Sequence, residues 1–218
     1  MNPSQYAILW DMDGTLIDTT EMHFASWINV FKKYQLELPY STFLKFFGKN
    51  NHAFILHFFP DADEAFIKAL SDEKESEFCG IAKNNARLYP GVLQWLQYFQ
   101  SKGYKQCIAS SAPMMNIDVL LETTNIRPFF DYCASGANMP AKPDPALFLS
   151  VAKQVGVSVK HCLVIEDAPP GVQGAVNAKM NCLAISNSRA ADELHEADFV
   201  ISAFTDDGLR KAEDMLLN

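Results

Sequence analysis

The chain has 218 residues, of which 49% are hydrophobic and 20% are charged, so it can build one folded domain with a modest insert. This composition excludes a disordered or fibrous chain. The 18 Lys and Arg residues stand against 26 Asp and Glu residues, giving a formal net charge of −8. A protein that binds a phosphate backbone needs a positive surface, so we expect no nucleic acid partner.

The sequence shows no features typical of a membrane or secreted protein. No apolar run approaches the roughly 20 residues that cross a bilayer, and the first residues lack the basic and apolar regions of a signal peptide. The five cysteines show no paired metal-ligand spacing, and three lie in apolar runs typical of strands. We therefore expect buried, reduced thiols in a cytoplasmic protein without a membrane partner. Nothing in the sequence indicates an oligomeric state.

The first predicted element is a strand at Tyr6–Trp10, a continuous apolar run that ends at Asp11. Such a run is typical of a strand buried on both faces of a parallel sheet. The following stretch, from about 18 to 86, has helical periodicity instead. Asp18 and Glu21 resemble a capping arrangement at the start of its first helix. Further helices are predicted over Ser41–Phe47, Ala53–Phe59 and Asp63–Phe78.

From about Leu88 to the end, apolar runs alternate with helical patterns. Strands are predicted at Gln106–Ala109, Cys162–Ile165, Cys182–Ile185 and Phe199–Ile201, and helices at Val92–Lys102, Ala146–Val155, Gly171–Lys179 and Asp206–Leu217. This alternation predicts an α/β fold with a Rossmann-like, doubly wound parallel sheet. The core would comprise residues 1–17 and 87–218. An inserted small α-helical cap domain, residues 18–86, would lie above the carboxyl edge of the sheet, where open α/β sheets bind ligands.

Two carboxylates follow the first strand directly. Asp11 and Asp13 are two residues apart, so both side chains point to the same side of the strand end. Neighbouring carboxylates repel, which is resolved either by a divalent cation or by a division into nucleophile and general acid/base. An ordinary polar turn is the simpler explanation of this pair taken alone.

A second acidic pair, Glu166 and Asp167, ends the predicted strand at Cys162–Ile165. In a parallel sheet this pair lies at the same edge as Asp11 and Asp13. Four carboxylates in one crevice repel strongly unless a cation joins them, and oxygen ligands favour Mg²⁺. A helix cap is the alternative for Glu166 and Asp167 on their own.

Two further strand ends carry phosphate-binding chemistry. Ser110 and Ser111 follow the third predicted strand, where hydroxyl and N–H groups suit a phosphate oxygen, although serine is also an ordinary N-cap. Lys142 lies between stiffening prolines and a predicted helix, where it could neutralise a nucleophile or a phosphate. A solvated surface lysine is the alternative.

Taken together, these residues resemble the motifs of the haloacid dehalogenase superfamily of phosphotransferases. The helical insert after the first motif is similar to that of the subfamily with a small four-helix cap. The resemblance covers almost the whole chain, from Tyr6 to Ile201, and rests on Asp11, Asp13-Gly14-Thr15, Ser110, Lys142-Pro143 and Glu166-Asp167 in this order.

This resemblance implies a role for each motif. Asp11 would attack phosphorus and form an aspartyl-phosphate, and Asp13 would protonate the leaving alcohol and later activate water. Mg²⁺ would be bound by Asp11, the backbone carbonyl of Asp13, and Asp167, with Glu166 in support. The transferred phosphoryl group would be held by Ser110 and Lys142. The presence of Asp13 argues against carbon–halogen cleavage, because dehalogenases of the superfamily lack this second acid.

The choice between phosphatase and mutase depends on the insert. The run from Asp18 to His23 resembles the first cap segment of β-phosphoglucomutase, and the resemblance implies that Thr19 and His23 help to orient Asp13. An interface residue on an amphipathic helix is the alternative for His23. That mutase carries serine, lysine and asparagine where this chain has Ala112-Pro113-Met114, and its cap arginine would fall near Asn50 or Asn51, with Lys49 a poor substitute.

We therefore expect a Mg²⁺-dependent phosphatase that hydrolyses a small phosphorylated metabolite, with a sugar phosphate as the expected substrate class. A β-phosphoglucomutase-type phosphosugar mutase is the first alternative. A non-catalytic binding protein that keeps the fold is the second, although the intact Asp11, Asp13, Lys142 and Asp167 argue against it.

Overall fold

The structure is a computed structural model that describes residues 2–46 and 51–217. It divides into two compact units: Met1–Asp18 together with Arg87–Asn218, and Thr19–Ala86. The predictions for Lys49 and Asn50, and the predicted helix end at Phe47, lie outside the described residues.

The first unit is built on a six-stranded sheet in which all paired strands are parallel, in the order β3-β2-β1-β4-β5-β6. This confirms the predicted α/β, doubly wound fold. The strands are β1 (Ala7–Trp10), β2 (Lys105–Ser110), β3 (Tyr132–Ser135), β4 (Cys162–Glu166), β5 (Asn181–Ile185) and β6 (Phe199–Ile201). Strand β3 was not predicted, because a short edge strand that is largely half-buried lacks a continuous apolar run.

Strand β1 lies at the centre of the sheet, paired with β2 on one side and β4 on the other. All of its residues are fully buried, as the continuous apolar run predicted. The ladder extends one residue further, since the Asp11 N–H donates to the carbonyl of Ile165 at 2.9 Å. The side chain of Asp11 therefore emerges at the middle of the carboxyl edge.

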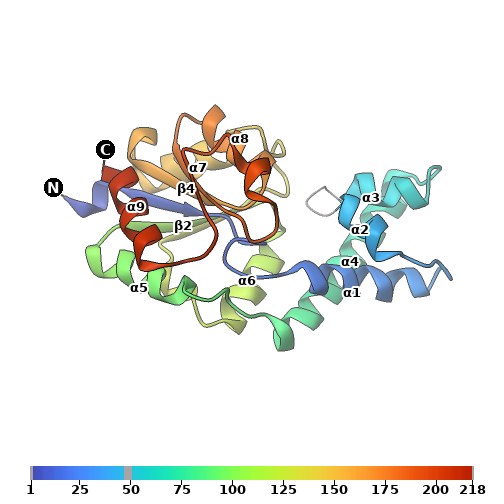
Figure 1. The fold of residues 1–218 in the computed structure, drawn as a ribbon. Helices are drawn as coiled ribbons and strands as arrows, with labels where there is room; N and C mark the ends of the chain where they lie inside the picture. The colour runs from blue at the N-terminus through green and yellow to red at the C-terminus, as the bar shows by residue number, and fades with distance from the viewer. Residues whose placement is uncertain (1, 47–50, 218) are drawn as a thin grey trace. The chain divides into compact units, whose positions relative to one another are not determined.

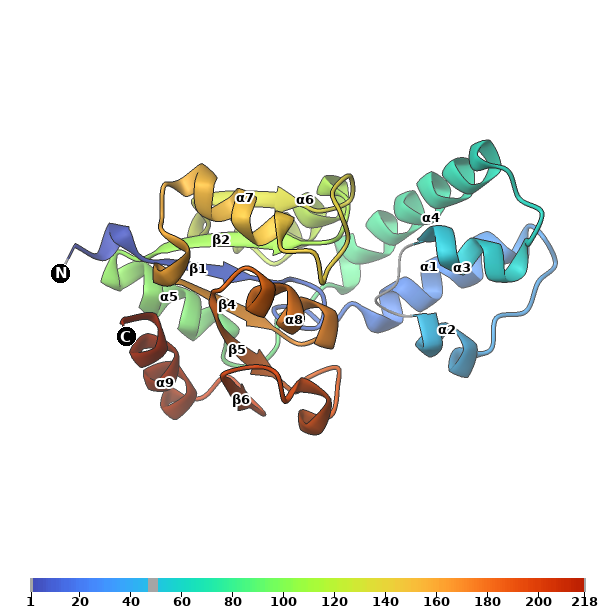
Figure 2. The same ribbon diagram turned by 90° about the horizontal axis from the view of Figure 1, so that it is seen from above.

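Helices cover both faces of this sheet, with α7 and α8 on one face and α5 and α9 on the other (Figure 1). Figure 2 shows α7 and α8 lying across the strands. The helices are α5 (Val92–Lys102), α6 (Met114–Thr123), α7 (Ala146–Val155), α8 (Pro169–Asn177) and α9 (Asp206–Leu217), with short 3₁₀ turns at Pro3–Gln5, Arg127–Phe129, Val159–His161 and Ala191–Leu194. Helix α8 begins before the predicted Gly171, because proline is well suited to a first helical turn.

One hydrophobic layer of this unit fills the space between the sheet and α7 and α8. Leu9, Ala109 and Val164 come from adjacent strands, and Phe148 and Val172 come from the two helices. These side chains are almost completely buried. The layer fixes the ends of β1, β2 and β4, and therefore the loops that follow them.

The second unit is helical, as predicted for residues 18–86. It contains α1 (Thr20–Lys32), α2 (Tyr40–Phe46), α3 (Asn51–Phe58) and α4 (Glu64–Asn85). Thr19, not Asp18, occupies the N-cap position of α1, so the predicted capping arrangement is wrong by one residue. Helix α4 runs beyond the predicted end at Phe78, and its N-cap Asp63 accepts a hydrogen bond from the Phe66 N–H at 2.8 Å.

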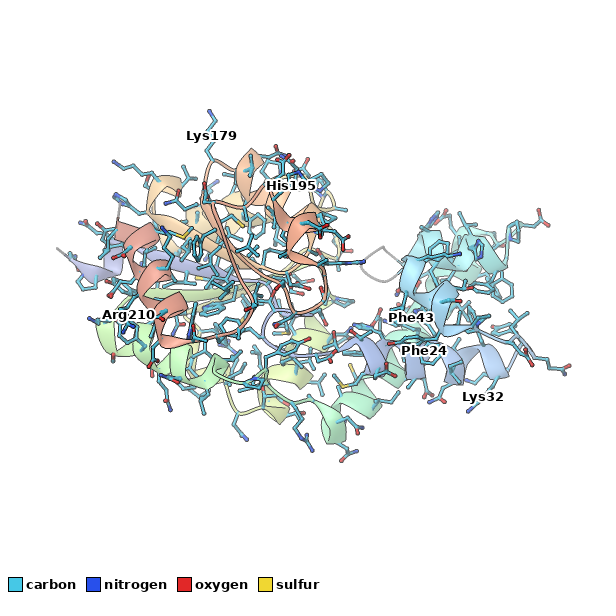
Figure 3. The ribbon with its side chains drawn as sticks, in the orientation of Figure 1. Phe24, Lys32, Phe43, Lys179, His195 and Arg210 are labelled. Atoms are coloured by element: carbon cyan, nitrogen blue, oxygen red, sulfur yellow. The ribbon has the colours of Figure 1, made fainter. Side chains whose placement is uncertain are left out.

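Aromatic rings form the core of the second unit. Trp27 and Phe31 of α1 pack against Phe54 of α3, with ring centroids 4.5 and 5.8 Å apart. Phe24 and Phe43 lie close together beside them, as Figure 3 shows, with centroids 5.3 Å apart. The apolar stripe of α1 therefore packs inside its own unit.

All five cysteines are free thiols. Cys107, Cys162 and Cys182 are buried as predicted, and burial raises the pKa of the Cys107 and Cys162 thiols to about 12. Cys79 and Cys133 are only partly buried, which corrects the expectation for these two. Among the described helices, none is both long and apolar enough to cross a membrane.

Candidate active site

Lys142 connects the first and last acidic motifs. Its Nζ lies 2.7 Å from Asp11 Oδ1 and 2.8 Å from Glu166 Oε1, and it also donates to the carbonyl of Ala109 at 3.2 Å. The lysine side chain is only 9% exposed, and its ammonium lies 5.0 Å from the centre of the Phe148 ring. The surface-lysine alternative is therefore wrong.

Glu166 uses both of its carboxylate oxygens. Oε1 accepts from Lys142, while Oε2 accepts from the backbone N–H groups of Asp167 and Ala168 at 2.8 and 2.9 Å. A Cβ atom on Gly171, in the first turn of α8, would lie only 1.7 Å from Oε1, so only glycine leaves room there. Glu166 is thus both a partner of the lysine and a cap for the N–H groups that precede α8.

Asp167 lies against the loop that follows β1. The Thr15 hydroxyl donates to Asp167 Oδ1 at 3.0 Å, and both residues are nearly fully buried. Gly14 adopts a φ of +86°, and a Cβ atom there would lie 2.1 Å from Asp167 Oδ2. The glycine in the first motif therefore serves both the left-handed turn and the close approach of this carboxylate.

Burial sets the protonation chemistry of this edge. It raises the pKa of Asp11 well above its ordinary value, with Lys142 opposing the rise and the neighbouring carboxylates adding to it. Burial and Glu166 raise the pKa of Asp167 to about 7, although hydrogen bonds from Ser188 and Thr15 oppose the rise. Burial alone would lower the pKa of Lys142, but Asp11 and Glu166 raise it, so this ammonium stays charged.

The two serines after β2 differ in burial. Ser110 is 1% exposed, and its hydroxyl accepts from the Ala112 N–H at 3.1 Å and donates weakly to Asp13 Oδ2 at 3.4 Å. Ser111, the next residue, is exposed. Ser110 therefore lies beside the candidate acid/base Asp13, whereas Ser111 faces solvent.

A loop after β5 also reaches this edge, and the sequence analysis did not anticipate it. The Asn187 side-chain amide donates to the carbonyls of Gly14 and Thr15 at 3.1 and 3.4 Å. The Ser188 hydroxyl donates to Asp167 Oδ2 and, at 3.4 Å, to the Asp167 carbonyl. The only available sequence signal was a polar Asn-Ser pair at the end of a predicted strand neighbouring β4.

The remaining two candidates, Thr19 and His23, belong to the second unit. Thr19 is fully buried at the start of α1, and His23 follows one turn later. His23 Nδ1 lies 2.8 Å from Nζ of Lys74, and its ring stacks on Phe78 with centroids 4.2 Å apart. A lysine ammonium can only donate, so His23 Nδ1 accepts and the neutral ring carries its proton on Nε2. Lys74 was missed because a buried lysine on a charged helix leaves no periodic signal.

The donor set suits a hard divalent cation. Asp11, Glu166 and Asp167 each offer one carboxylate oxygen, and these atoms lie within 4.8 Å of one another. When all three carboxylates are ionised, one ammonium is buried with them, which leaves a deficit of two positive charges. Oxygen-only donors with this charge fit Mg²⁺ better than a soft transition metal. The Asp13 carboxylate is not part of this group of three.

Similar proteins are found over most of the chain. It is 32% identical to Protein SUPPRESSOR OF QUENCHING 1, chloroplastic, of Arabidopsis thaliana over 88% of its length, but spans only 19% of that protein. It is 28% identical to a phosphorylated carbohydrates phosphatase of Thermotoga maritima, covering 79% of this chain and 81% of that protein.

Solved structures show the same fold. The structure of β-phosphoglucomutase from Clostridium difficile matches with a TM-score of 0.83, over 97% of this chain and 98% of the other, at 21% identity. The model of the haloacid dehalogenase-like hydrolase family matches residues 8–185, which contain Asp11, Ser110, Lys142 and Asp167. The chain therefore belongs to the haloacid dehalogenase-like hydrolase family.

Proposed function

We propose that this protein is a Mg²⁺-dependent phosphoric monoester hydrolase that acts on a small phosphorylated carbohydrate through an aspartyl-phosphate. The observation that carries the proposal is the buried Lys142 ammonium between Asp11 and Glu166, beside Asp167. Phosphoryl transfer needs in-line positioning and neutralised charge rather than elaborate chemistry. The Lys142 ammonium supports the second requirement at this edge. The similarity to a carbohydrate phosphatase supports the substrate class.

In the first half-reaction, a carboxylate oxygen of Asp11 attacks phosphorus and the ester P–O bond breaks. Asp13 gives its proton to the leaving alkoxide, so the sugar leaves as a neutral alcohol. Lys142 and Ser110 hold the oxygens of the transferred group. The ammonium of Lys142 offsets the negative charge that Asp11 and the phosphoryl group bring together.

In the second half-reaction, Asp13 takes a proton from water, which attacks phosphorus and breaks the bond to Asp11. Inorganic phosphate leaves, and both aspartates return to their starting states. Mg²⁺ would be held by Asp11, Asp167 and the backbone carbonyl of Asp13, with Glu166 in support, and would supply Lewis-acid stabilisation of phosphoryl charge.

The helical unit would serve as the inserted cap domain, residues 18–86, with 1–17 and 87–218 as the core. Within it, Lys74 would hold the His23 ring through Nδ1, and His23 would help to orient the acid/base Asp13. Thr19 would orient the same aspartate.

A phosphate-release assay tests the proposal. Sugar phosphates, nucleotides and p-nitrophenyl phosphate are compared with and without Mg²⁺, and the Asp11→Asn variant runs beside the wild type. We expect Mg²⁺-dependent release that falls by more than about 100-fold in the variant, because its amide is not a nucleophile. Residual activity above a few per cent would contradict the role of Asp11.

The mutase alternative is separated by a second assay. A mutase would convert a sugar 1-phosphate to a 6-phosphate with a bisphosphate primer while releasing little phosphate. We favour hydrolysis because Ala112-Pro113-Met114 offers no side-chain cation for a second phosphate. Isomerisation faster than phosphate release would overturn this choice, and silence in both assays would support the non-catalytic alternative.

A further inference from the structure

We propose that Asn187 and Ser188, in the loop after β5, are positioning residues that hold Asp167 and the Gly14–Thr15 segment in the geometry that binds Mg²⁺. The loop stands outside the four motifs that the sequence analysis identified. The inference rests on the proposed function only in assigning Mg²⁺ to this edge.

The first step concerns Asp167, whose side chain is held from two sides. Thr15 Oγ1 donates to Oδ1 at 3.0 Å, and Ser188 Oγ donates to Oδ2. The two hydroxyls come from different loops and together fix the rotation of the carboxylate plane. Each carboxylate oxygen has two lone-pair directions, so one hydroxyl on each still leaves a direction open to a cation.

The second step concerns the segment after Asp13. The Asn187 amide spans two successive carbonyls, those of Gly14 and Thr15. These groups belong to the turn that brings Asp13 and Thr15 to the site. The turn passes close to Asp167, since a Cβ atom on Gly14 would lie 2.1 Å from Asp167 Oδ2. An amide that bonds two successive carbonyls restrains both peptide units. Asn187 thereby restrains the backbone on one side while Ser188 restrains the carboxylate on the other.

The third step is that this loop is itself anchored. The Ser186 N–H donates to the carbonyl of Ile201 in β6 at 2.9 Å, and its hydroxyl donates to the same carbonyl at 3.3 Å. The anchor faces the neighbouring strand and not the carboxylates. Residues 187 and 188 therefore project from a fixed base, as a positioning role requires.

Calorimetric titration of Mg²⁺ into the protein without substrate tests the inference. Residues that orient metal ligands typically change metal affinity by about 10–100-fold, so we expect Ser188→Ala to raise the dissociation constant by that factor. Ser188→Thr keeps the hydroxyl and should restore most of the affinity. The matched control is Ser101→Ala, which removes an exposed hydroxyl that donates to the Tyr98 carbonyl within α5 and should leave the affinity unchanged.

Asn187→Ala separates backbone restraint from metal affinity. At saturating Mg²⁺, we expect its kcat to fall about 10–100-fold, because a small displacement of Asp13 misaligns proton transfer. Its Mg²⁺ dissociation constant should change less than that of Ser188→Ala. Urea unfolding of each variant shows whether the fold is intact, and Ser188→Thr keeps the test decisive if Ser188→Ala unfolds.

The outcomes distinguish this inference from the proposed function. Wild-type protein that binds Mg²⁺ but releases no phosphate would refute the hydrolase, while the affinity series would still decide the role of Ser188. Equal Mg²⁺ affinity in wild type and Ser188→Ala would overturn the positioning role. Absence of Mg²⁺ binding by the wild type at millimolar concentration would overturn both the metal assignment and this inference.

Discussion

Replacement of Lys142 by methionine tests how the buried carboxylates are tolerated. The substitution keeps an unbranched side chain of similar volume but removes the ammonium that lies 2.7 Å from Asp11 and 2.8 Å from Glu166. Removing one partner of a buried ion pair leaves an uncompensated charge, which typically costs about 3–5 kcal/mol. We therefore expect a loss of this size at pH 7.5 in the absence of Mg²⁺.

The assay is urea unfolding followed by fluorescence. With a slope of about 2.5 kcal/mol per molar urea, the expected loss moves the midpoint by roughly 1–2 M. The loss should shrink at pH 5, because protonated carboxyls need no counter-charge. Added Mg²⁺ should stabilise the variant more than the wild type, since the cation would then be the main counter-charge of the same oxygens.

The control is Arg210→Met, which removes an exposed cation paired with Asp207 in the same unit (Figure 3). Exposed pairs contribute about 0–1 kcal/mol, so its midpoint should hardly change. If Lys142→Met unfolds at the same urea concentration as the wild type at pH 7.5, the lysine is not the counter-charge of these carboxylates and the electrostatic argument fails.

Three further predictions concern charge and close packing. In Mg²⁺-free protein, the free energy of unfolding should rise as pH falls from 8 toward 5. The reason is that a carboxyl whose pKa is raised to about 7 in the folded state, as in Asp167, binds its proton more tightly in the folded than in the unfolded state. Chemical denaturation across this range should give a slope of up to about 1.4 kcal/mol per pH unit for each such proton, and a flat profile would contradict the prediction. Gly171→Ala should displace Glu166, lower the stability of the protein by about 1–3 kcal/mol and reduce its activity. The control Gly80→Ala, in open space on α4, should stabilise the protein by up to about 1 kcal/mol. Equal thermal midpoints for the two variants would refute the crowding at Glu166. In the helical unit, Glu75→Ala removes the carboxylate that lies 3.0 Å from the buried Lys74 ammonium and should cost about 3–5 kcal/mol of stability in urea unfolding. Adding Lys74→Met should relieve part of this loss in the double variant. Strictly additive losses would argue against the ion pair.

Strands were predictable from the sequence where all of their residues are buried. Fully buried strands such as β1 and β4 are continuous apolar runs, and a parallel sheet covered on both faces requires such runs, so their positions were predictable. Edge strand β3 is largely half-buried and left no such run. The start of α1 was shifted by one residue because Asp18 and Thr19 are both residue types that can cap a helix.

In the candidate site, too, some contacts were predictable from the sequence and others were not. Asp11, Glu166 and Asp167 were predicted to meet because each directly follows a strand of one parallel sheet, and their ligand atoms do lie within 4.8 Å. The contact of Lys142 with two of them was not derivable from its own surroundings in sequence. Only the resemblance to the haloacid dehalogenase superfamily pointed to that lysine, and the structure supplies the distances.

By itself, the sequence determined the class of fold and the identity of the chemical groups at the carboxyl edge, because both depend on short runs of neighbouring residues. Tertiary structure alone decided the hydrogen-bond partners that these groups take from distant loops and helices. Asn187 and Ser188 reach Gly14 and Asp167 across a large sequence separation, and Lys74 meets His23 from another helix. Hydrogen bonds of this kind depend on packing between distant segments, which leaves no periodic trace in the chain, so they became visible only when β5 was placed beside β4 and α4 beside α1.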